Sequence, residues 1–492
     1  MEKDHQISQL PKDGLAGLTQ NFGKDATSGF VVFLLALPLS LGIAAASGFP
    51  PIMGVLTAII GGLVATFFTG SQLSIKGPAA GLIVIVADCV GAFGGGDEGW
   101  RLALGVMVVA GIIQILMGVF KWGKFVDIFP LSAVHGMLAA IGFIIIAKQV
   151  PVLLNVDPSL AAGKGPLALF AAIPSFFANL DSQVKIIGGV SLAIMLGWGF
   201  VKHPLLKQIP APLLVLIFAV PASLMMNLGA EAPDYTLVKV GKIIDQVGIN
   251  ASAEGFSQTG IFVKFVIMVS LVGTLESLLT VKAIDMLDPW KRKADPNKDI
   301  IAIGVSNSFA GLLGGLPMIS EVARSSANVA QGARTRWANF FHGLFLLLSV
   351  LLAYQVLELI PNAALAAMLI AVGIKLAHPK EFIHMLKVGP EQLAIFITTI
   401  FFTLAKDLLV GIAAGMVLKA IIHLSRGVSP RSLFQARAAV DHESDRYLLR
   451  LGNAAIFTNY LGIKKHLDKI PEGKAIVLDL TKTAVIDHSV ME

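Results

Sequence analysis

Long apolar runs alternate with short polar loops along almost the whole chain. Fourteen runs are of spanning or half-spanning length, in two sets of seven whose third member is short. Because a helix needs about 20 apolar residues to cross a bilayer, the pattern predicts an α-helical polytopic membrane protein. The runs cover residues 28–47, 52–69, 79–94, 101–119, 126–147, 184–202 and 208–226, then 261–284, 299–316, 318–331, 337–356, 361–376, 390–405 and 408–425.

The two sets of runs are expected to be inverted repeats. Seven is an odd number, so two related halves of seven segments must have opposite orientations in the membrane. An offset of 239 residues places Pro78 of the first set on Pro317 of the second. We therefore predict a transmembrane domain over residues 28–426, with repeats at about 28–226 and 261–426.

Glycine and proline interrupt the chain at the third run of each set. Gly77 and Pro78 lie in IKGPAAGLIVIV (75–86), and Pro317 lies in GLPMISEVARSSANVAQGARTR (315–336). A pair of such interrupted segments is the best sequence pointer to a substrate site at the bilayer midplane. Each half-helix N-terminus offers free N–H groups and about half a positive charge. The pattern predicts a site for a small anion.

Composition agrees with this class and excludes others. Of 492 residues, 55% are hydrophobic and 14% charged, and the mean hydropathy is +0.77. A single cysteine, Cys89, excludes a disulfide framework, and no HExxH or phosphate-binding glycine loop is present. No basic–aromatic pattern suggests nucleic acid. We expect no enzyme and no cofactor, except a Na⁺ coupling ion.

Basic residues gather in alternate loops, which sets the expected orientation. Lysine and arginine favour the cytoplasmic side of a membrane. We therefore place residues 1–27 and the C-terminus in the cytoplasm of a protein of the inner or plasma membrane, with membrane lipid around it. The loop residues concerned are Lys121, Lys124, Lys202, Lys207, Lys291, Arg292, Lys293, Lys298, Arg334, Arg336, Lys380, Lys387, Arg426 and Arg431.

The pattern changes after Gly427. Residues 446–457 read as a strand, 461–470 as an amphipathic helix and 474–480 as a buried strand. This predicts the start of a small cytoplasmic α/β domain over 427–492, which we expect to be truncated.

Several motifs together resemble the SulP family of inorganic anion transporters. The first is LALPLSLGIAAASGFPPIMGVL (35–56), the second is the Gly77-Pro78 entry, and the third is LPMISEVARSSANVAQGARTR (316–336). The tail resembles the STAS domain of that family, with VLDL (477–480) and VIDHS (485–489) in the expected places. The combination is specific, although no single motif is.

The resemblance implies a fold, a mechanism and a set of site residues. The fold is two inverted seven-helix repeats divided into a core (segments 1–4 and 8–11) and a gate, in a homodimer with elevator-like movement. A cytoplasmic regulator would bind to the STAS-like domain. The anion is expected between the N-termini of segments 3 and 10, at Gly77, Pro78, Ala79, Ala80, Ser320, Glu321, Val322, Ala323 and Arg324, with Phe33 and Ser40 from the first segment.

Two charged residues within apolar runs are candidates for the transport chemistry. An unpaired arginine in a membrane costs about 2.5–3.5 kcal/mol on insertion scales, so Arg324 is expected to add positive potential to the anion site. The alternatives are snorkelling to the cytoplasmic face or pairing with a carboxylate. Glu276, with Thr280 one turn later, matches the family position for cation coupling. It would bind Na⁺ or take up a proton, or else be a structural partner of Arg324.

The sequence departs from the family at two positions. Lys76 precedes Gly77, where the family has a small residue, and Glu321 lies where the family has a small, uncharged stretch. One hypothesis is that Lys76 and Glu321 form an ion pair across the repeats. The alternative leaves Lys76 in cytoplasmic water and Glu321 as the cap of its own helix.

The expected function is a secondary active anion transporter. The residue after Pro38 is the apolar Leu39, where sulfate-type members often have Gln. Bicarbonate also loses its hydration at lower cost than a dianion. We therefore favour bicarbonate by Na⁺-coupled symport over sulfate by H⁺ symport or anion exchange. Further alternatives are a nucleobase or carboxylate transporter, a channel-like conductance and a STAS-based regulatory scaffold.

Overall fold

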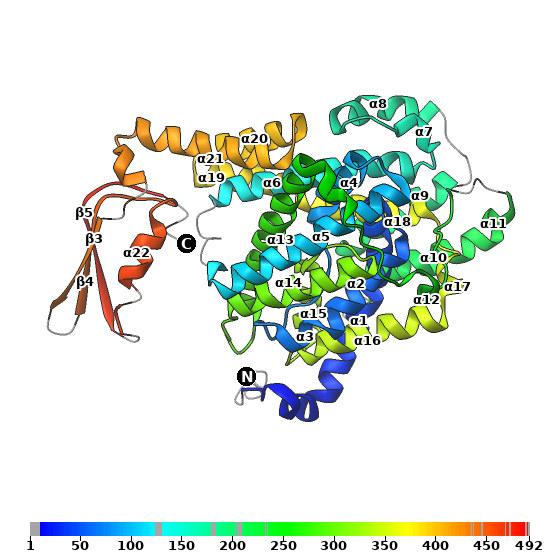
Figure 1. Cartoon of the computed structure of the whole chain (residues 1–492), viewed down its shortest axis with the longest axis horizontal. Coiled ribbons are helices and arrows are strands. Elements are labelled where there is room, and N and C mark those ends of the chain that lie inside the picture. Colours follow the sequence, from blue (N-terminus) through cyan, green and yellow to red (C-terminus); the bar gives the residue numbers. More distant parts are fainter. Residues whose placement is uncertain are drawn as a thin grey trace. The chain divides into compact units, whose positions relative to one another are not determined.

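The computed structural model of the chain is predominantly helical (Figure 1). It divides into two compact units, one of residues 1–123 and 142–375 and one of residues 124–141 and 376–492. We describe each unit by itself. The residues that the structure describes are 10–123, 130–178, 184–201, 203, 209–231, 233, 235–433, 435, 437–443, 446–467, 469–471, 474–487 and 490.

The larger unit holds most of the apolar helices and two very short strands. Its elements are α1 (Gly14–Ala46), α2 (Pro51–Leu63), α3 (Ala65–Phe68), β1 (Lys76–Pro78), η1 (Ala80–Leu82), α4 (Ile83–Ala92), α5 (Gly96–Val119), the greater part of α6 (Leu131–Leu153), α7 (Pro158–Ala161), α8 (Pro166–Ala178), α9 (Val184–Gly197), η3 (Trp198–Phe200), α10 (Ala211–Met225), α11 (Leu228–Glu231), α12 (Ile243–Gln246), η5 (Glu254–Gln258), α13 (Thr259–Leu287), α14 (Pro296–Leu313), β2 (Met318–Ser320), α15 (Val322–Ala330), α16 (Trp337–Leu352), α17 (Tyr354–Leu357) and α18 (Asn362–Leu376).

In its described part, the smaller unit combines four α-helices and one 3-10 helix with a three-stranded sheet, together with the first residues of α6. Its elements are α19 (Pro379–Val388), α20 (Pro390–Ala405), α21 (Leu408–Ser425), η6 (Pro430–Leu433), β3 (Arg437–Glu443), β4 (Arg446–Ala455), α22 (Tyr460–Leu467) and β5 (Ala475–Ile486).

A helix lies within each of the fourteen predicted apolar runs. The largest difference is at the first run, because α1 begins at Gly14, where the Asp13 side chain accepts a hydrogen bond from the Gly14 N–H. Among the described residues, seven helices are long and apolar enough to cross a membrane, and six apolar helices are shorter. The predicted helical fold is confirmed. Of the loop cations used for orientation, Lys124, Lys202 and Lys207 lie outside the described residues.

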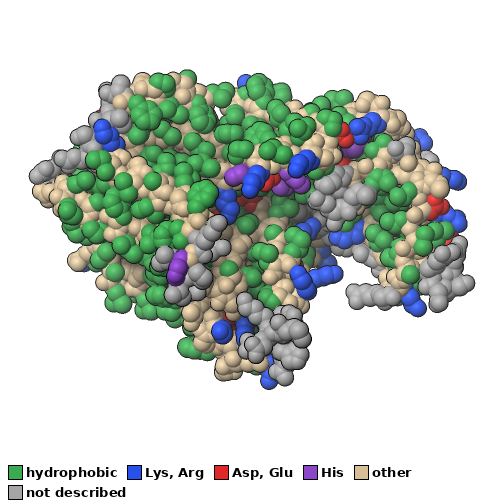
Figure 2. Space-filling model, turned by 180° about the vertical axis from the view of Figure 1, so that it is seen from behind, with side chains coloured by type: hydrophobic (Ala, Val, Ile, Leu, Met, Phe, Trp, Pro, Cys, Tyr) green, Lys and Arg blue, Asp and Glu red, His purple; other side chains and the backbone are tan. Residues whose placement is uncertain are grey.

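The surface suits a lipid environment. Figure 2 shows hydrophobic side chains over much of one face of the molecule. Large apolar residues such as Ile217 and Val263 are exposed on the helices of the larger unit, as Phe401 and Val417 are on those of the smaller. Such extensive apolar exposure is rare in soluble monomers and is expected where lipid covers the surface.

The strands β1 and β2 join the two halves of the larger unit. They pair antiparallel, with Lys76 opposite Ser320 and Pro78 opposite Met318. Each strand leads directly toward a short helix, β1 through η1 to α4 and β2 to α15. The glycine–proline interruptions are therefore extended segments that pair with each other, and they set the starting points of two half-helices.

A buried ion pair lies under the paired strands. The Lys76 Nζ is 2.7 Å from Asp299 Oδ1 and also donates to Ser74 Oγ and Ser320 Oγ at 2.6 and 2.7 Å. These three acceptors account for all three ammonium hydrogens. Thr69 Oγ1 donates to Asp299 Oδ1 at 2.7 Å, and both charged side chains are fully buried.

The predicted Lys76–Glu321 ion pair is wrong, and so is the alternative that Lys76 lies in water. Lys76 and Ser320 are opposite each other in the strand pair, so their side chains share one face of it. Successive residues of a strand point to opposite faces, so Glu321 is directed away from Lys76. The face of Lys76 instead meets Asp299, near the start of α14.

The C-terminal sheet has the order β3-β4-β5, antiparallel between β3 and β4 and parallel between β4 and β5. The predicted strand at 446–457 and helix at 461–470 are confirmed by β4 and α22, whereas β3 was not predicted. The predicted burial of the last strand is wrong. Ile476 and Leu478 of β5 are 43% and 54% exposed and Val477 between them is 38% exposed, so neither face of this part of the strand is covered in the described structure.

The Lys76–Asp299 pair predicts a large loss of stability when one partner is neutralised. Asp299→Asn should lower the stability of the folded protein by about 3–5 kcal/mol, because the ammonium remains buried without its counter-charge. The measurement is the thermal unfolding temperature of the purified protein in detergent.

The matched control is Asp97→Asn, which breaks the exposed Asp97–Arg101 pair of 3.0 Å. That change should cost at most about 1 kcal/mol. Equal unfolding temperatures for Asp299→Asn and the control would contradict a dominant role for the buried pair.

Candidate functional site

The predicted anion-site residues come together where the two half-helices begin. Gly77 and Pro78 lie in β1, and Ala79 and Ala80 lead into η1 and α4. From the other half, Ser320 ends β2, Glu321 is the residue before α15, and 322–324 form the first turn of α15. Strand pairing therefore brings together segments that are about 240 residues apart in the sequence.

Arg324 is fully buried beside the strands. Its Nη2 donates to Ser40 Oγ at 3.2 Å, which brings the predicted site residue Ser40 to the guanidinium. Neither Nε nor Nη1 has a hydrogen-bond partner among the described residues. Arg324 therefore does not snorkel to solvent, and it keeps two donors for a ligand.

Gly77 makes room for this guanidinium. A Cβ placed on Gly77 would meet Arg324 Nη1, so the arginine side chain points at the backbone of β1. Any other residue at position 77 would have to displace the guanidinium. The glycine is therefore required by the close approach of charge and backbone.

Glu276 lies in the middle of α13 and is 6% exposed. A Cβ on Gly81 would meet its carboxylate, so the side chain points at the start of α4. Neither oxygen has a hydrogen-bond partner in the described structure, and no ion pair there joins the residue to Arg324. The alternative of a structural Glu276–Arg324 pair is wrong. A buried carboxylate without partners is costly, which points to a bound cation or proton.

Thr280 lies one turn after Glu276 on α13 and is also buried. Side chains four residues apart on a helix share a face. Thr280 is therefore placed to add a hydroxyl oxygen beside the carboxylate. Oxygen atoms of this kind suit Na⁺, although no group of three or more His, Cys, Asp or Glu able to hold a metal occurs among the described residues.

Glu321 is half-buried and points toward the opposite half-helix. Its Oε1 accepts a hydrogen bond of 3.4 Å from the Ala80 N–H, at the beginning of η1. It makes no side-chain capping bond to its own helix α15. The predicted capping of its own helix is therefore wrong, because the carboxylate caps the other half-helix.

Phe33 lies in a cluster of rings. Its ring centroid is 5.7 Å from that of Phe30 and 6.2 Å from that of Phe345. These two ring contacts show that Phe33 packs against neighbouring aromatic side chains. Its place at the anion site stays a prediction.

Sequence reasoning missed residues that hold the strands in place. Asn307 Oδ1 accepts from the Met318 N–H at 2.6 Å, and Ser277 Oγ accepts from the Ser320 N–H at 3.0 Å. His342 of α16 is fully buried with both ring nitrogens unpartnered in the described structure. A polar residue inside an apolar helix was the available signal for each of these positions.

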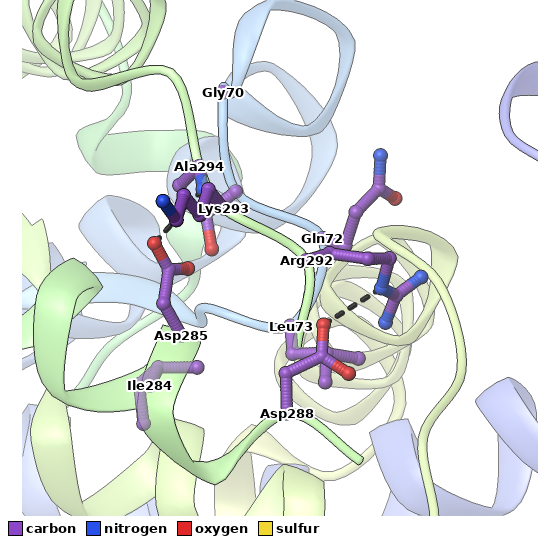
Figure 3. A pocket seen from close by; sticks show the side chains of 10 residues that line it. Gly70, Gln72, Leu73, Ile284, Asp285, Asp288, Arg292, Lys293 and Ala294 are labelled. Atoms are coloured by element: carbon purple, nitrogen blue, oxygen red, sulfur yellow. Dashed lines mark hydrogen bonds and ion pairs between the residues drawn. The ribbon is translucent and has the colours of Figure 1, made fainter. Parts of the chain in front are cut away.

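A separate small pocket lies at the connection between α13 and α14 (Figure 3). Asp288 pairs with Arg292 there at 2.7 Å, and Asp285 accepts from the Ala294 N–H at 2.8 Å. The pocket encloses about 10 Å³, which is space for about one water molecule. It is too small for an oxyanion.

Comparisons with known proteins identify relatives of this chain. The chain is 26% identical to the putative sulfate transporter YvdB of Bacillus subtilis over 415 residues, covering 83% of this chain and 74% of the relative. It is 25% identical to the bicarbonate transporter BicA of Picosynechococcus, covering 83% and 71%.

Solved structures share the fold. The transmembrane domain of a cyanobacterial BicA matches with a TM-score of 0.68 at 23% identity, covering 80% of this chain and 97% of that one. The structure of SLC26A9 matches with a TM-score of 0.72 at 15% identity, covering 96% and 82%. The C-terminal strands are compatible with a partial STAS domain.

The model of the sulfate permease family matches residues 22–399, which is most of the chain. The members of this family are integral multi-pass membrane transporters and not enzymes. The chain therefore belongs to the sulfate permease (SulP) family.

Proposed function

We propose that this protein is a secondary active transporter that carries bicarbonate across the inner or plasma membrane by symport with Na⁺. The observation that carries the proposal is a pair of buried charged side chains with unpartnered polar atoms, Arg324 in the first turn of α15 and Glu276 of α13 facing Gly81. The Arg324 guanidinium has two nitrogens without hydrogen-bond partners, and the Glu276 carboxylate has two oxygens without them. One group suits an anion and the other suits a cation.

The anion would bind at Arg324 and the start of α4. A guanidinium is a planar fork of donors that matches two oxygens of an oxyanion. The Ala80 N–H lies at a half-helix N-terminus, where the helix dipole also favours negative charge. One guanidinium compensates one negative charge, and a monoanion is desolvated at lower cost than a dianion. These arguments favour bicarbonate.

The cation would bind at Glu276 and Thr280. Its binding neutralises a carboxylate close to the anion site, so each ion strengthens the binding of the other. Such coupling is reciprocal by thermodynamic necessity, and it is the condition for symport. A proton on Glu276 would serve the same purpose, which is the basis of the alternative of H⁺-coupled sulfate transport. Relatives of both substrate types are among the similar proteins.

The movement that we propose is elevator-like. All the site residues, from Ser40 to Arg324, belong to the larger compact unit. In such a mechanism the site travels with one rigid part of the protein while another part stays fixed. A homodimer, cytoplasmic termini and a regulator at the STAS-like domain complete the proposal.

Uptake into proteoliposomes tests the proposed symport. Labelled bicarbonate uptake should require an inward Na⁺ gradient, and Glu276→Gln should reduce the Na⁺-driven component at least ten-fold because the neutral amide attracts the cation weakly. Labelled sulfate should be taken up poorly. Glu98→Gln, an exposed carboxylate on α5, should leave uptake unchanged. Sulfate uptake indifferent to Na⁺ would contradict the assignment.

Substitution of Arg324 tests the anion site separately. Arg324→Gln should raise the bicarbonate KM at least ten-fold, because the site loses its positive charge, and Arg324→Lys should keep part of the affinity. Arg101→Gln, in the exposed pair on α5, is the matched control. An unchanged KM in Arg324→Gln protein with a wild-type elution profile would show that the anion binds elsewhere.

A further inference from the structure

We propose that Glu321 makes the anion site selective for monoanions that carry an O–H hydrogen-bond donor. The inference rests on the proposed function and defines the chemical class of its substrate. Bicarbonate belongs to this class, since it has one negative charge and one hydroxyl. Nitrate, with the same charge and trigonal shape, does not.

The first step is the position of the Glu321 carboxylate. Its Oε1 lies 3.4 Å from the Ala80 nitrogen, so it is in contact with the N-terminus of the half-helix that would receive the anion. That distance exceeds the usual 2.7–3.2 Å for N–H···O, so the bond is weak and easily exchanged. Glu321 and Ala80 are half-buried and Arg324 is fully buried, and Glu321 is the charge that lies near Arg324. An anion bound to Arg324 and the Ala80 N–H would therefore lie close to Glu321.

The second step is the charge balance around the site. Arg324 contributes one positive charge, and Glu276 and Glu321 contribute two negative charges. The Lys76–Asp299 pair lies on the other face of the strands. Its two charges compensate each other, with 2.7 Å between Lys76 Nζ and Asp299 Oδ1. When a coupling cation neutralises Glu276, the positive charge of Arg324 is left to compensate the negative charge of the substrate. Glu321 then remains as an extra carboxylate at the mouth of the site.

The third step is hydrogen-bond complementarity. An ionised carboxylate only accepts hydrogen bonds, so an anion without a proton presents lone pairs to it and is repelled. Bicarbonate can turn its hydroxyl to Glu321 and its two other oxygens to Arg324 and the Ala80 N–H. A site built to bond a substrate hydroxyl strongly rejects analogues that lack it. The buried His342 also lies near Arg324, and neither of its ring nitrogens has a hydrogen-bond partner in the described structure.

Competition against labelled bicarbonate uptake tests this selectivity. Proteoliposomes with a saturating Na⁺ gradient are held at one pH at which bicarbonate predominates, and unlabelled bicarbonate or nitrate is added. For wild type, nitrate should inhibit at least ten-fold more weakly than bicarbonate. In Glu321→Gln the two should inhibit within about two-fold of each other, because the amide can donate to nitrate.

Two further variants make the result specific. Glu321→Asp keeps a carboxylate acceptor and should retain most of the wild-type preference. Glu98→Gln, an exposed carboxylate far along the sequence, should retain all of it. If Glu321→Gln fails to fold, as judged by its elution profile, the wild-type and Glu321→Asp ratios decide.

Two outcomes would overturn the inference. The first is that nitrate and bicarbonate compete equally in wild type. The second is that their ratio is the same in Glu321→Gln as in wild type, as when that variant binds both anions more tightly by one common factor because simple charge repulsion is lost. Bicarbonate uptake without discrimination defeats only this inference. Sulfate uptake without bicarbonate uptake defeats the proposed function itself.

Discussion

The need to satisfy every backbone polar group inside a membrane governs this structure. A broken helix frees N–H and C=O groups that lipid cannot hydrogen-bond, so irregular backbone is tolerated only where protein satisfies it. Here β1 and β2 pair with each other across the repeats. Side chains complete the set: Ser325 Oγ accepts from the Ile75 N–H at 2.8 Å and Asn339 Oδ1 from the Lys76 N–H at 3.1 Å. The two half-helices can start at mid-domain because of these bonds.

The same strands separate two kinds of buried charge. On one face, Lys76 and Asp299 satisfy each other together with three hydroxyl groups. Close by, Arg324 and Glu276 are equally buried but keep donors and acceptors without partners. Buried charges of the first kind have partners for their hydrogen-bonding atoms and stabilise one structure. Buried charges of the second kind have unpartnered atoms and are costly unless a ligand binds to them. This contrast is the reason for assigning transport to Arg324 and Glu276 and not to Lys76.

Features contained in one short segment could be predicted from the sequence, whereas contacts between distant segments could not. The apolar runs, the interrupted half-helices and the isolated charges Glu276 and Arg324 were predictable, since each is visible in a short segment. A membrane favours long apolar helices and penalises chain breaks and charges within them. The partner of Lys76 was not predictable, because Asp299 is 223 residues away on α14 and meets the face of the strand pair on which Lys76 lies. The direction of Glu321 depended on the register of the same strand pair. The exposure of β5 depended on whether the rest of the fold covers its two faces, which a hydrophobic pattern alone does not reveal.

A structure of the purified protein in saturating bicarbonate and Na⁺ would test the central claim most directly. The account predicts an anion between the Arg324 Nη1 and the Ala80 nitrogen, with its remaining oxygen at the Glu321 carboxylate, and a cation at Glu276. The anion should disappear when bicarbonate is omitted. An anion bound at a place that Arg324 does not contact, under conditions that saturate uptake, would contradict the account.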